Sequence, residues 1–421
     1  MINRLAIFFD RIFTRKKLLA LLVVFSVSYI VTISIVTVNF LQEFPLVTNN
    51  DDYQSNFLKF HENKYDAILD GTTPLYFQTI EILYRMTGSV DVSFFLLNMV
   101  AIIGYIIIAL RLVKKYARYD LYHVCLLAIF IFHFIYLKSY FRASNDTFMG
   151  LFIFIIVYQL ILLFKGNRSY WRFIIAGSCV GAMVCTRPTF LLLCPLLFLI
   201  TLFYFKQSRL KEALLRTTIA LLCCMTIVLI FNWDSLQANG SLSFIDKNPT
   251  NGMNWTQKNY LGLDKMFNKG ERLHEETNWG TTFDEVQEHL DRNGKDSLPT
   301  NLLEFVTHDT TLYAKLVLYN IARSLFELMR SFGLFIFLPL IIVFQKRFNF
   351  FLHAYFFQIV LVSAVCLTLV EVRWFIGYEL FFFYGILCYF KNSKIAYINS
   401  LLSLSLILLT LFNIRTIVNA L

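Results

Sequence analysis

The chain has 421 residues, of which 57% are hydrophobic and only 16% are charged. A soluble domain carries about 25% charged residues, so a soluble chain of this composition would expose large apolar patches. The formal net charge is +10, but many basic residues lie in short loops between apolar runs, which excludes a solvated basic domain that binds nucleic acid. Composition therefore predicts an all-α polytopic integral membrane protein.

Apolar runs recur along the whole chain. A membrane-spanning helix needs about 20 mostly apolar residues, and the sequence offers about eleven such runs. They lie near residues 18–40, 93–112, 121–137, 147–164, 173–187, 189–205, 217–232, 331–345, 350–370, 374–390 and 395–412. The first run is too long for a signal peptide and lacks an A-x-A-like cleavage site, so it is predicted to be the first spanning helix.

The loops between these runs alternate in charge. With the N-terminus in the cytoplasm, the cytoplasmic loops hold 20 of the 38 Lys and Arg residues but only three of the 28 Asp and Glu residues. This pattern predicts a multi-pass protein of the plasma membrane with its C-terminus outside the cytoplasm. It divides the chain into an N-terminal transmembrane module (1–232) with a first outer loop (42–92), a large extracytoplasmic loop (233–330) and C-terminal transmembrane helices (331–421).

The first outer loop contains two half-apolar stretches. In the first, bulky residues recur every three or four positions, which predicts a short amphipathic helix that lies in the membrane interface. These residues are Tyr53, Phe57, Phe60 and Lys64. A Gly-to-Pro break over 71–74 separates this helix from a second stretch over 75–86.

Asp51 and Asp52 directly follow the first predicted span. A carboxylate within hydrogen-bond reach of a sugar hydroxyl can take its proton while that oxygen bonds to an anomeric carbon. The alternative is that the pair only caps the following helix. The two acids could also hold a divalent cation, although no complete octahedral ligand set is visible. No other cofactor or metal site is predicted, because the eight cysteines all lie within apolar runs and match no zinc or disulfide pattern.

Several short motifs together resemble the GT-C superfamily of membrane glycosyltransferases, which use polyprenyl-phosphate sugars. They are the acidic pair, the two interfacial helices with Pro74-Leu75-Tyr76, Phe141-Arg142-Ala143-Ser144-Asn145-Asp146, Cys185-Thr186-Arg187-Pro188-Thr189, and Glu371-Val372-Arg373-Trp374. The resemblance implies a GT-C-like fold and transfer of a hexose to a glycan or lipid-linked acceptor at the outer face, with one of the acids as base. The Asp-Asp form, in place of the commoner Asp-Glu, is similar to bacterial inner-membrane enzymes of surface-polysaccharide biosynthesis, including O-antigen-modifying glucosyltransferases, and leaves open which acid is the base.

Arg142, Arg187 and Arg373 come from three separate outer loops or helix ends, all predicted at the outer leaflet. The guanidinium group suits a pair of phosphate oxygens, and its charge stabilises a leaving phosphate. The three arginines are therefore candidates for binding the donor's phosphate. The alternatives are contact with lipid headgroups, or ion pairs with Glu371 or Asp146.

The large outer loop supplies aromatic candidates for sugar contact. Trp255 and Trp279, together with Tyr53 of the first loop, could stack on sugar rings, whereas ordinary core packing is the alternative for both tryptophans. Two other functions remain open. A polysaccharide polymerase or ligase would depend on Arg272 and His274 of this loop, and a lipid-linked saccharide flippase or transporter would need charges in the middle of the membrane.

Overall fold

The computed structural model describes residues 53–65, 74–116, 143–187, 192–240, 242, 253–270 and 281–392, with single positions at 405, 408 and 411. All regular structure in these residues is helical. The predicted spans at 18–40 and 121–137, and nearly all of that at 395–412, lie outside the described residues.

Three of the described helices are long and apolar enough to cross a membrane. They are α6 (Val90–Tyr116, spanning over Val90–Leu112), α8 (Asp146–Phe164) and α11 (Leu210–Phe231). The described part of the chain is therefore all-helical, and its apolar helices indicate that the protein associates with a membrane.

Shorter apolar helices occupy the other described runs. They are α9 (Tyr170–Val184), α10 (Cys194–Gln207), η6 with α17 (Gly333–Phe337 and Leu338–Phe344), α18 (Phe350–Val365) and α19 (Glu379–Asn392). The run predicted at 331–345 is broken, because Gly333 adopts a positive φ of 59° and opens a 3₁₀ turn before α17.

The chain folds into two compact units. Unit 1 comprises Met1–Ile245, Glu327–Phe356 and Arg373–Leu421, and unit 2 comprises Asp246–Phe326 and Phe357–Val372. The long helix α16 (Thr310–Phe332) and α18 each contribute residues to both units.

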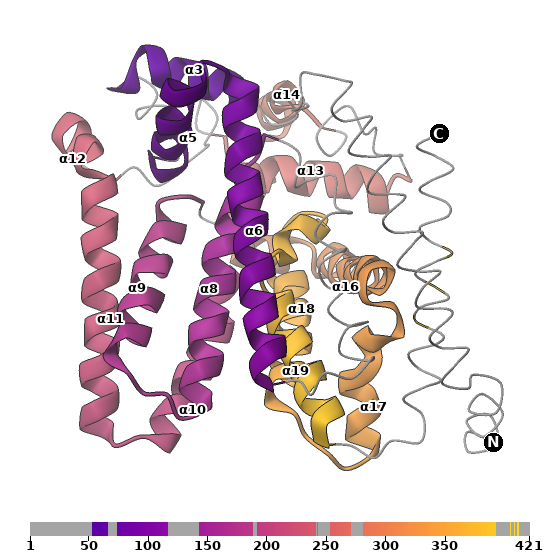
Figure 1. Ribbon diagram of the computed structural model, residues 1–421. Helices are drawn as coiled ribbons and strands as arrows, with labels where there is room; N and C mark the ends of the chain where they lie inside the picture. The colour runs from indigo at the N-terminus through magenta and orange to yellow at the C-terminus, as the bar shows by residue number, and fades with distance from the viewer. Residues whose placement is uncertain are drawn as a thin grey trace. The chain divides into compact units, whose positions relative to one another are not determined.

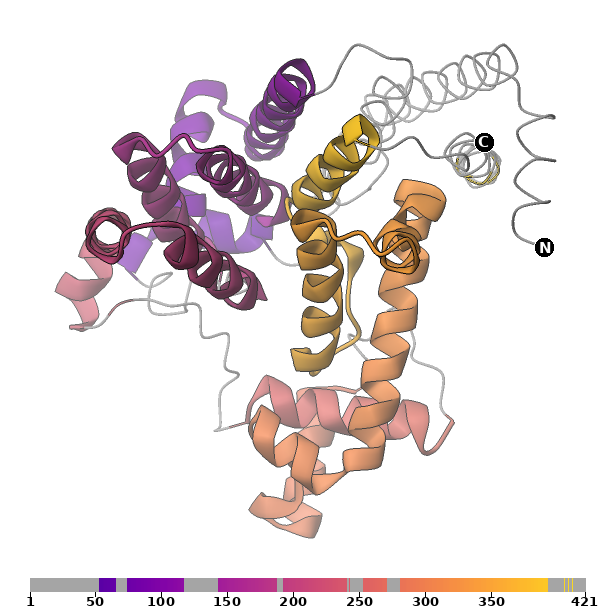
Figure 2. The same cartoon turned by 90° about the horizontal axis from the view of Figure 1, so that it is seen from below.

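In unit 1, the helices α11, α9, α8 and α6 pack side by side in that order (Figures 1 and 2). The contact between α9 and α11 is close because Gly177 and Gly181, one turn apart, face the backbone of Ala220 and Cys224. A Cβ on Gly177 would lie 2.7 Å from the carbonyl carbon of Ala220. Small residues at this spacing let two apolar helices approach within van der Waals distance along their backbones.

The two helices predicted in the first outer loop are confirmed as α3 (Tyr53–Glu62) and α5 (Pro74–Thr87). The predicted apolar face of α3 is buried, since Tyr53, Phe57 and Phe60 pack against α5 and α6. Pro74 starts α5, where its fixed φ and missing N–H cost the helix nothing. Beyond α3, the Lys64 ammonium pairs with Asp234 of α12 (Trp233–Asn239).

Unit 2 is built from short helices around a small apolar core. Its helices are α13 (Trp255–Phe267), α14 (Phe283–Asn293), η5 (Lys295–Ser297), α15 (Leu302–His308) and the first part of α16. Helix α16 is amphipathic. Capping boxes at Asn254 and Thr282 satisfy the first backbone N–H groups of α13 and α14.

Candidate functional site

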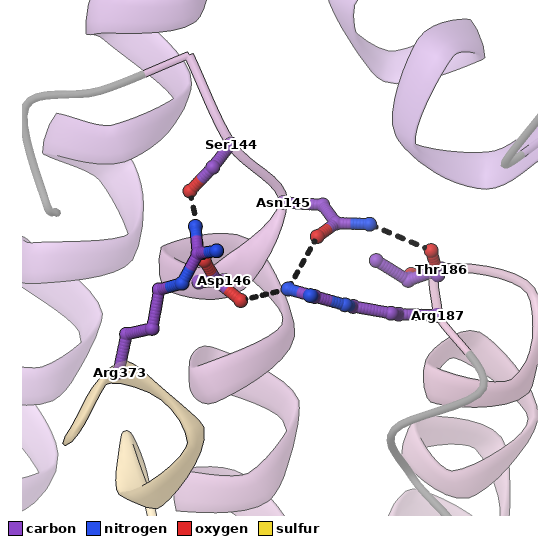
Figure 3. A network of polar contacts seen from close by, with 6 residues as sticks. All are labelled: Ser144, Asn145, Asp146, Thr186, Arg187 and Arg373. Atoms are coloured by element: carbon purple, nitrogen blue, oxygen red, sulfur yellow. Dashed lines mark hydrogen bonds and ion pairs between the residues drawn. The ribbon is translucent and has the colours of Figure 1, made fainter. Parts of the chain in front are cut away.

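Three charged side chains from distant segments of unit 1 meet at the start of α8. The Asp146 carboxylate accepts a hydrogen bond from Arg187 Nη1 at Oδ1, and it accepts one from Arg373 Nη1 at Oδ2 over 3.2 Å. Two positive charges thus share one negative charge (Figure 3). The carboxylate is almost completely buried, whereas the side chains of Arg187 and Arg373 keep 20% and 15% of their surface exposed.

Neighbouring polar groups fix the Arg187–Asp146–Arg373 cluster. Asn145 accepts a hydrogen bond from Arg187 at 3.4 Å and donates one to the Thr186 carbonyl at 2.9 Å, so it ties the start of α8 to the end of α9. The Ser144 hydroxyl donates to Asp146 Oδ2 at 3.1 Å (Figure 3). Asparagine is a preferred N-cap residue, yet the Asn145 side chain makes no capping bond because it is committed to the α9 end.

The segment that carries Arg373 approaches α8 through two glycines. This segment is the short helix η7 (Val372–Phe375) together with the turn before α19. A Cβ on Gly150 would overlap Ile376, and a Cβ on Gly377 would lie 2.7 Å from Ile153 and 2.8 Å from the Gly150 carbonyl. Gly377 also has a φ of 94°, which L side chains rarely adopt. Glycine at both positions therefore allows Arg373 to reach Asp146.

An aromatic cluster lies directly beside the charged cluster. The Tyr76 ring of α5 packs against Phe148 of α8 with 5.9 Å between centroids and against the edge of Tyr53 at 5.8 Å. Leu75 N–H donates to the Cys185 carbonyl at 3.4 Å. Burial raises the pKa of Tyr76, and the nearby Tyr53 and Asp146 raise it further, so its hydroxyl stays protonated.

The structure brings together two of the three predicted phosphate-binding arginines, Arg187 and Arg373. Their common partner is Asp146, which the sequence offered only as an alternative ion-pair partner. A signal for it exists, since Asp146 is a carboxylate at the first position of an apolar helix, where an unpaired charge would be costly. Arg142, Asp51, Asp52 and Trp279 lie outside the described residues.

The aromatic candidates for sugar contact belong to different units. Tyr53 of unit 1 is only 8% exposed and forms part of the buried cluster under α3 and α5. Trp255 of unit 2 packs edge-on against Phe283 at 5.1 Å, and the Lys258 ammonium lies 5.0 Å from the centre of its ring. Core packing therefore accounts for much of the surface of both rings.

Within the described part of the chain, no group of three His, Cys, Asp or Glu side chains could hold a metal ion. Asp146 would be a poor cation ligand, because two guanidinium groups already occupy its oxygens. The seven described cysteines are free thiols. Comparison of the chain with protein-family models, with curated proteins and with solved structures gave no match.

Proposed function

We propose that the protein is a GT-C-type glycosyltransferase that moves a hexose from a polyprenyl-phosphate donor to a glycan or lipid-linked acceptor. The observation that carries the proposal is the convergence of Arg187 and Arg373 on one point of unit 1. A donor of this kind is tethered by its lipid, so its phosphate sits at a fixed depth near the membrane surface. Two partly exposed guanidinium groups at the end of an apolar helix bundle suit that phosphate.

The position of the cluster along α8 supports this reading. Asp146 is the first residue of α8, where the helix dipole and the free N–H groups of the first turn favour an anion. The 19 residues of α8 span about 28 Å, close to the thickness of a bilayer's hydrocarbon core. The arginines therefore lie at one membrane surface when α8 spans the bilayer.

We propose that the chain crosses the membrane about eleven times, and the arrangement of unit 1 supports the orientation proposed for it. Figure 1 shows α3 and α5 at one end of unit 1 and α10, with the turn between α8 and α9, at the opposite end. The basic residues over 165–172 and 206–216 lie in the turns and helix ends of that opposite end. The positive-inside rule then assigns α3, α5 and the arginines to the extracytoplasmic face of the plasma, or bacterial inner, membrane.

The proposed reaction is a substitution at the anomeric carbon. Asp51 or Asp52 accepts the proton of the acceptor hydroxyl while the acceptor oxygen bonds to that carbon. The bond from the carbon to the phosphate oxygen breaks, and polyprenyl phosphate leaves with the bonding electron pair, stabilised by the arginines. In the sequence the acidic pair directly precedes Tyr53, whose ring packs on Tyr76 beside the charged cluster.

The test is transfer of labelled sugar from polyprenyl-phosphate hexoses by the purified full chain. Arg187→Gln and Arg373→Gln should each reduce kcat/KM for the donor about 10- to 100-fold, since a hydrogen bond to a charged group contributes about 1.5–3 kcal/mol. Arg168→Gln is the matched control, because this exposed arginine at the opposite end of unit 1 bonds only to the Gln207 carbonyl among described residues. Equal activity of all three variants would overturn the phosphate site.

The acidic pair needs a separate test. Asp→Asn at the true base keeps the shape but removes proton acceptance, so kcat should fall about 10²–10⁴-fold with donor binding retained. If the single and double Asn variants of Asp51 and Asp52 turn over like the parent, a polymerase or ligase centred on Arg272 and His274 becomes the better account. Movement of a lipid-linked saccharide across vesicles without sugar transfer would favour a flippase instead.

A further inference from the structure

The hydroxyl of Tyr76 is one of several buried tyrosine hydroxyls of unit 1 that have no hydrogen-bond partner among the described residues. The Tyr76 side chain is fully buried, and no atom of the described residues lies within hydrogen-bond reach of its Oη. Leaving a buried hydroxyl without a partner is unfavourable, and native proteins rarely do so. The hydroxyl of Tyr76 is therefore available to donate a hydrogen bond to a polar group that comes within reach.

Tyr76 lies between the two segments that form the charged cluster. Its ring packs against Phe148, two residues after Asp146, and the neighbouring Leu75 amide bonds to Cys185, two residues before Arg187. Burial raises the pKa of Tyr76, and Asp146 is one of the groups that raise it further. The hydroxyl is therefore a protonated hydrogen-bond donor on a ring that packs against the first turn of α8, which begins at Asp146.

Asp146 holds the same guanidinium groups that the proposed donor phosphate requires. A carboxylate and a phosphate compete for the N–H fork of an arginine, because both offer a pair of anionic oxygens at similar spacing. The buried carboxylate lies against both partly buried guanidinium groups and compensates their charge. Asp146 can therefore keep the site assembled while no donor is bound.

We propose that the Asp146 carboxylate occupies the place of the donor's phosphate at Arg187 and Arg373 while no donor is bound. When the phosphate replaces the carboxylate there, Tyr76 acts as a positioning residue and binds the displaced carboxylate. In the donor-bound state the phosphate binds Arg187 and Arg373, and the released carboxylate oxygen accepts a hydrogen bond from Tyr76 Oη. This exchange rests on the proposed function and specifies how its phosphate site is held ready. In either state an anion lies against both arginines.

The first experiment measures the affinity of the full chain in detergent for a polyprenyl monophosphate. Asp146→Asn removes the competing charge and should tighten binding about tenfold, since one unit charge several ångströms away changes the binding free energy by more than 1 kcal/mol even at an effective dielectric constant of about 20. Tyr76→Phe removes the group that receives the carboxylate and should weaken binding about 3- to 10-fold. In the double variant the Tyr76 effect should vanish, because no carboxylate remains to be received.

Tyr355→Phe is the matched control. Tyr355 of α18 is also a fully buried tyrosine in unit 1 whose hydroxyl has no partner among the described residues, but its ring packs against Phe382 of α19. Removal of the Tyr355 hydroxyl should leave the affinity for polyprenyl monophosphate unchanged. Weaker binding by Asp146→Asn would show that Asp146 only builds the site, and a Tyr76→Phe effect that persists beside Asp146→Asn would show that Tyr76 does not act through the carboxylate. Either result overturns the exchange.

A second measurement covers the case in which Asp146→Asn does not fold. Infrared difference spectra of the otherwise unmutated protein with ring-labelled tyrosine, recorded with and without polyprenyl monophosphate, should show a shifted C–O stretch that Tyr76→Phe abolishes. An absent shift contradicts the exchange. Failure of the proposed function is a different result from failure of the exchange. The proposed function is contradicted if the parent chain does not bind the lipid phosphate, or if Arg187→Gln and Arg373→Gln bind it as the parent does.

Discussion

Gly150 of α8 is predicted to control whether Arg373 reaches Asp146. An added Cβ would overlap Ile376 Cγ2 and Tyr105 Oη, and neither neighbour can move freely. Tyr105 is buried and its hydroxyl donates to the Thr147 carbonyl. Ile376 is also buried, and its N–H donates to the Arg373 carbonyl at 3.3 Å. Gly150→Ala must therefore displace the segment that carries Arg373.

The expected size of the effect follows from these contacts. Ordinary carbon contacts lie at about 3.5–4.0 Å, so the Ile376 methyl must retreat by more than about 1 Å. Arg373 would move with it, and its 3.2 Å hydrogen bond to Asp146 would open. Overpacking costs about 1–3 kcal/mol, and the higher helix propensity of alanine offsets about 1 kcal/mol of that. The variant should fold with a slightly lower melting temperature, yet its KM for the lipid donor should rise about tenfold, as expected for loss of one charge-assisted hydrogen bond.

The assay compares thermal unfolding in detergent with donor KM. Gly104→Ala is the control, since this glycine of α6 faces only the flexible end of Leu151, whose Cδ1 would lie 2.6 Å from the new Cβ. That side chain can rotate away, so both quantities should stay near those of the parent. If Gly150→Ala and Gly104→Ala behave alike, the close approach of α8 and the Arg373 segment does not govern the site.

Three further predictions test the fold. Gly177→Leu should separate α9 from α11 and lower the melting temperature strongly, because its side chain would penetrate the backbone at Ala220; an unchanged melting curve contradicts that packing. Hydrogen bonds from Thr282 lower the pKa of Glu285, and hydrogen bonds from Thr300 lower the pKa of Glu304. Each ionised carboxylate therefore stabilises the fold at a pH above the unfolded Glu pKa of about 4.3, and this stabilisation is lost as the pH falls below that value. Acid unfolding of unit 2, followed by its hydrogen exchange, should then depend less on pH after Glu→Gln at either position. Finally, cysteines introduced at Asn63 and Asn293 should react with an impermeant thiol reagent from outside; labelling of either only after permeabilisation reverses the proposed orientation.

The sequence alone determined the features that depend on local patterns. Runs of apolar residues predicted the helices now seen as α6, α8 and α11, because a helix in lipid satisfies its own backbone hydrogen bonds and needs only length and apolar side chains. The three- and four-residue spacing of Tyr53, Phe57 and Phe60 likewise predicted the buried face of α3. Both signals can be read within a single turn or a single span.

Only the tertiary structure decided how the charged residues pair. Asp146 meets Arg187 41 positions along the chain and Arg373 227 positions along it, and no local pattern encodes such distances. The pairing depends on close backbone contacts, since Gly150 and Gly377 must both lack a side chain for Arg373 to approach. Asn145 shows the same priority, because it bonds to Thr186 across two helices and leaves its own helix uncapped. Leaving a buried carboxylate without its counter-ions costs more free energy than leaving one helix end without a side-chain cap. The long-range charge interactions therefore outweigh the local capping preference.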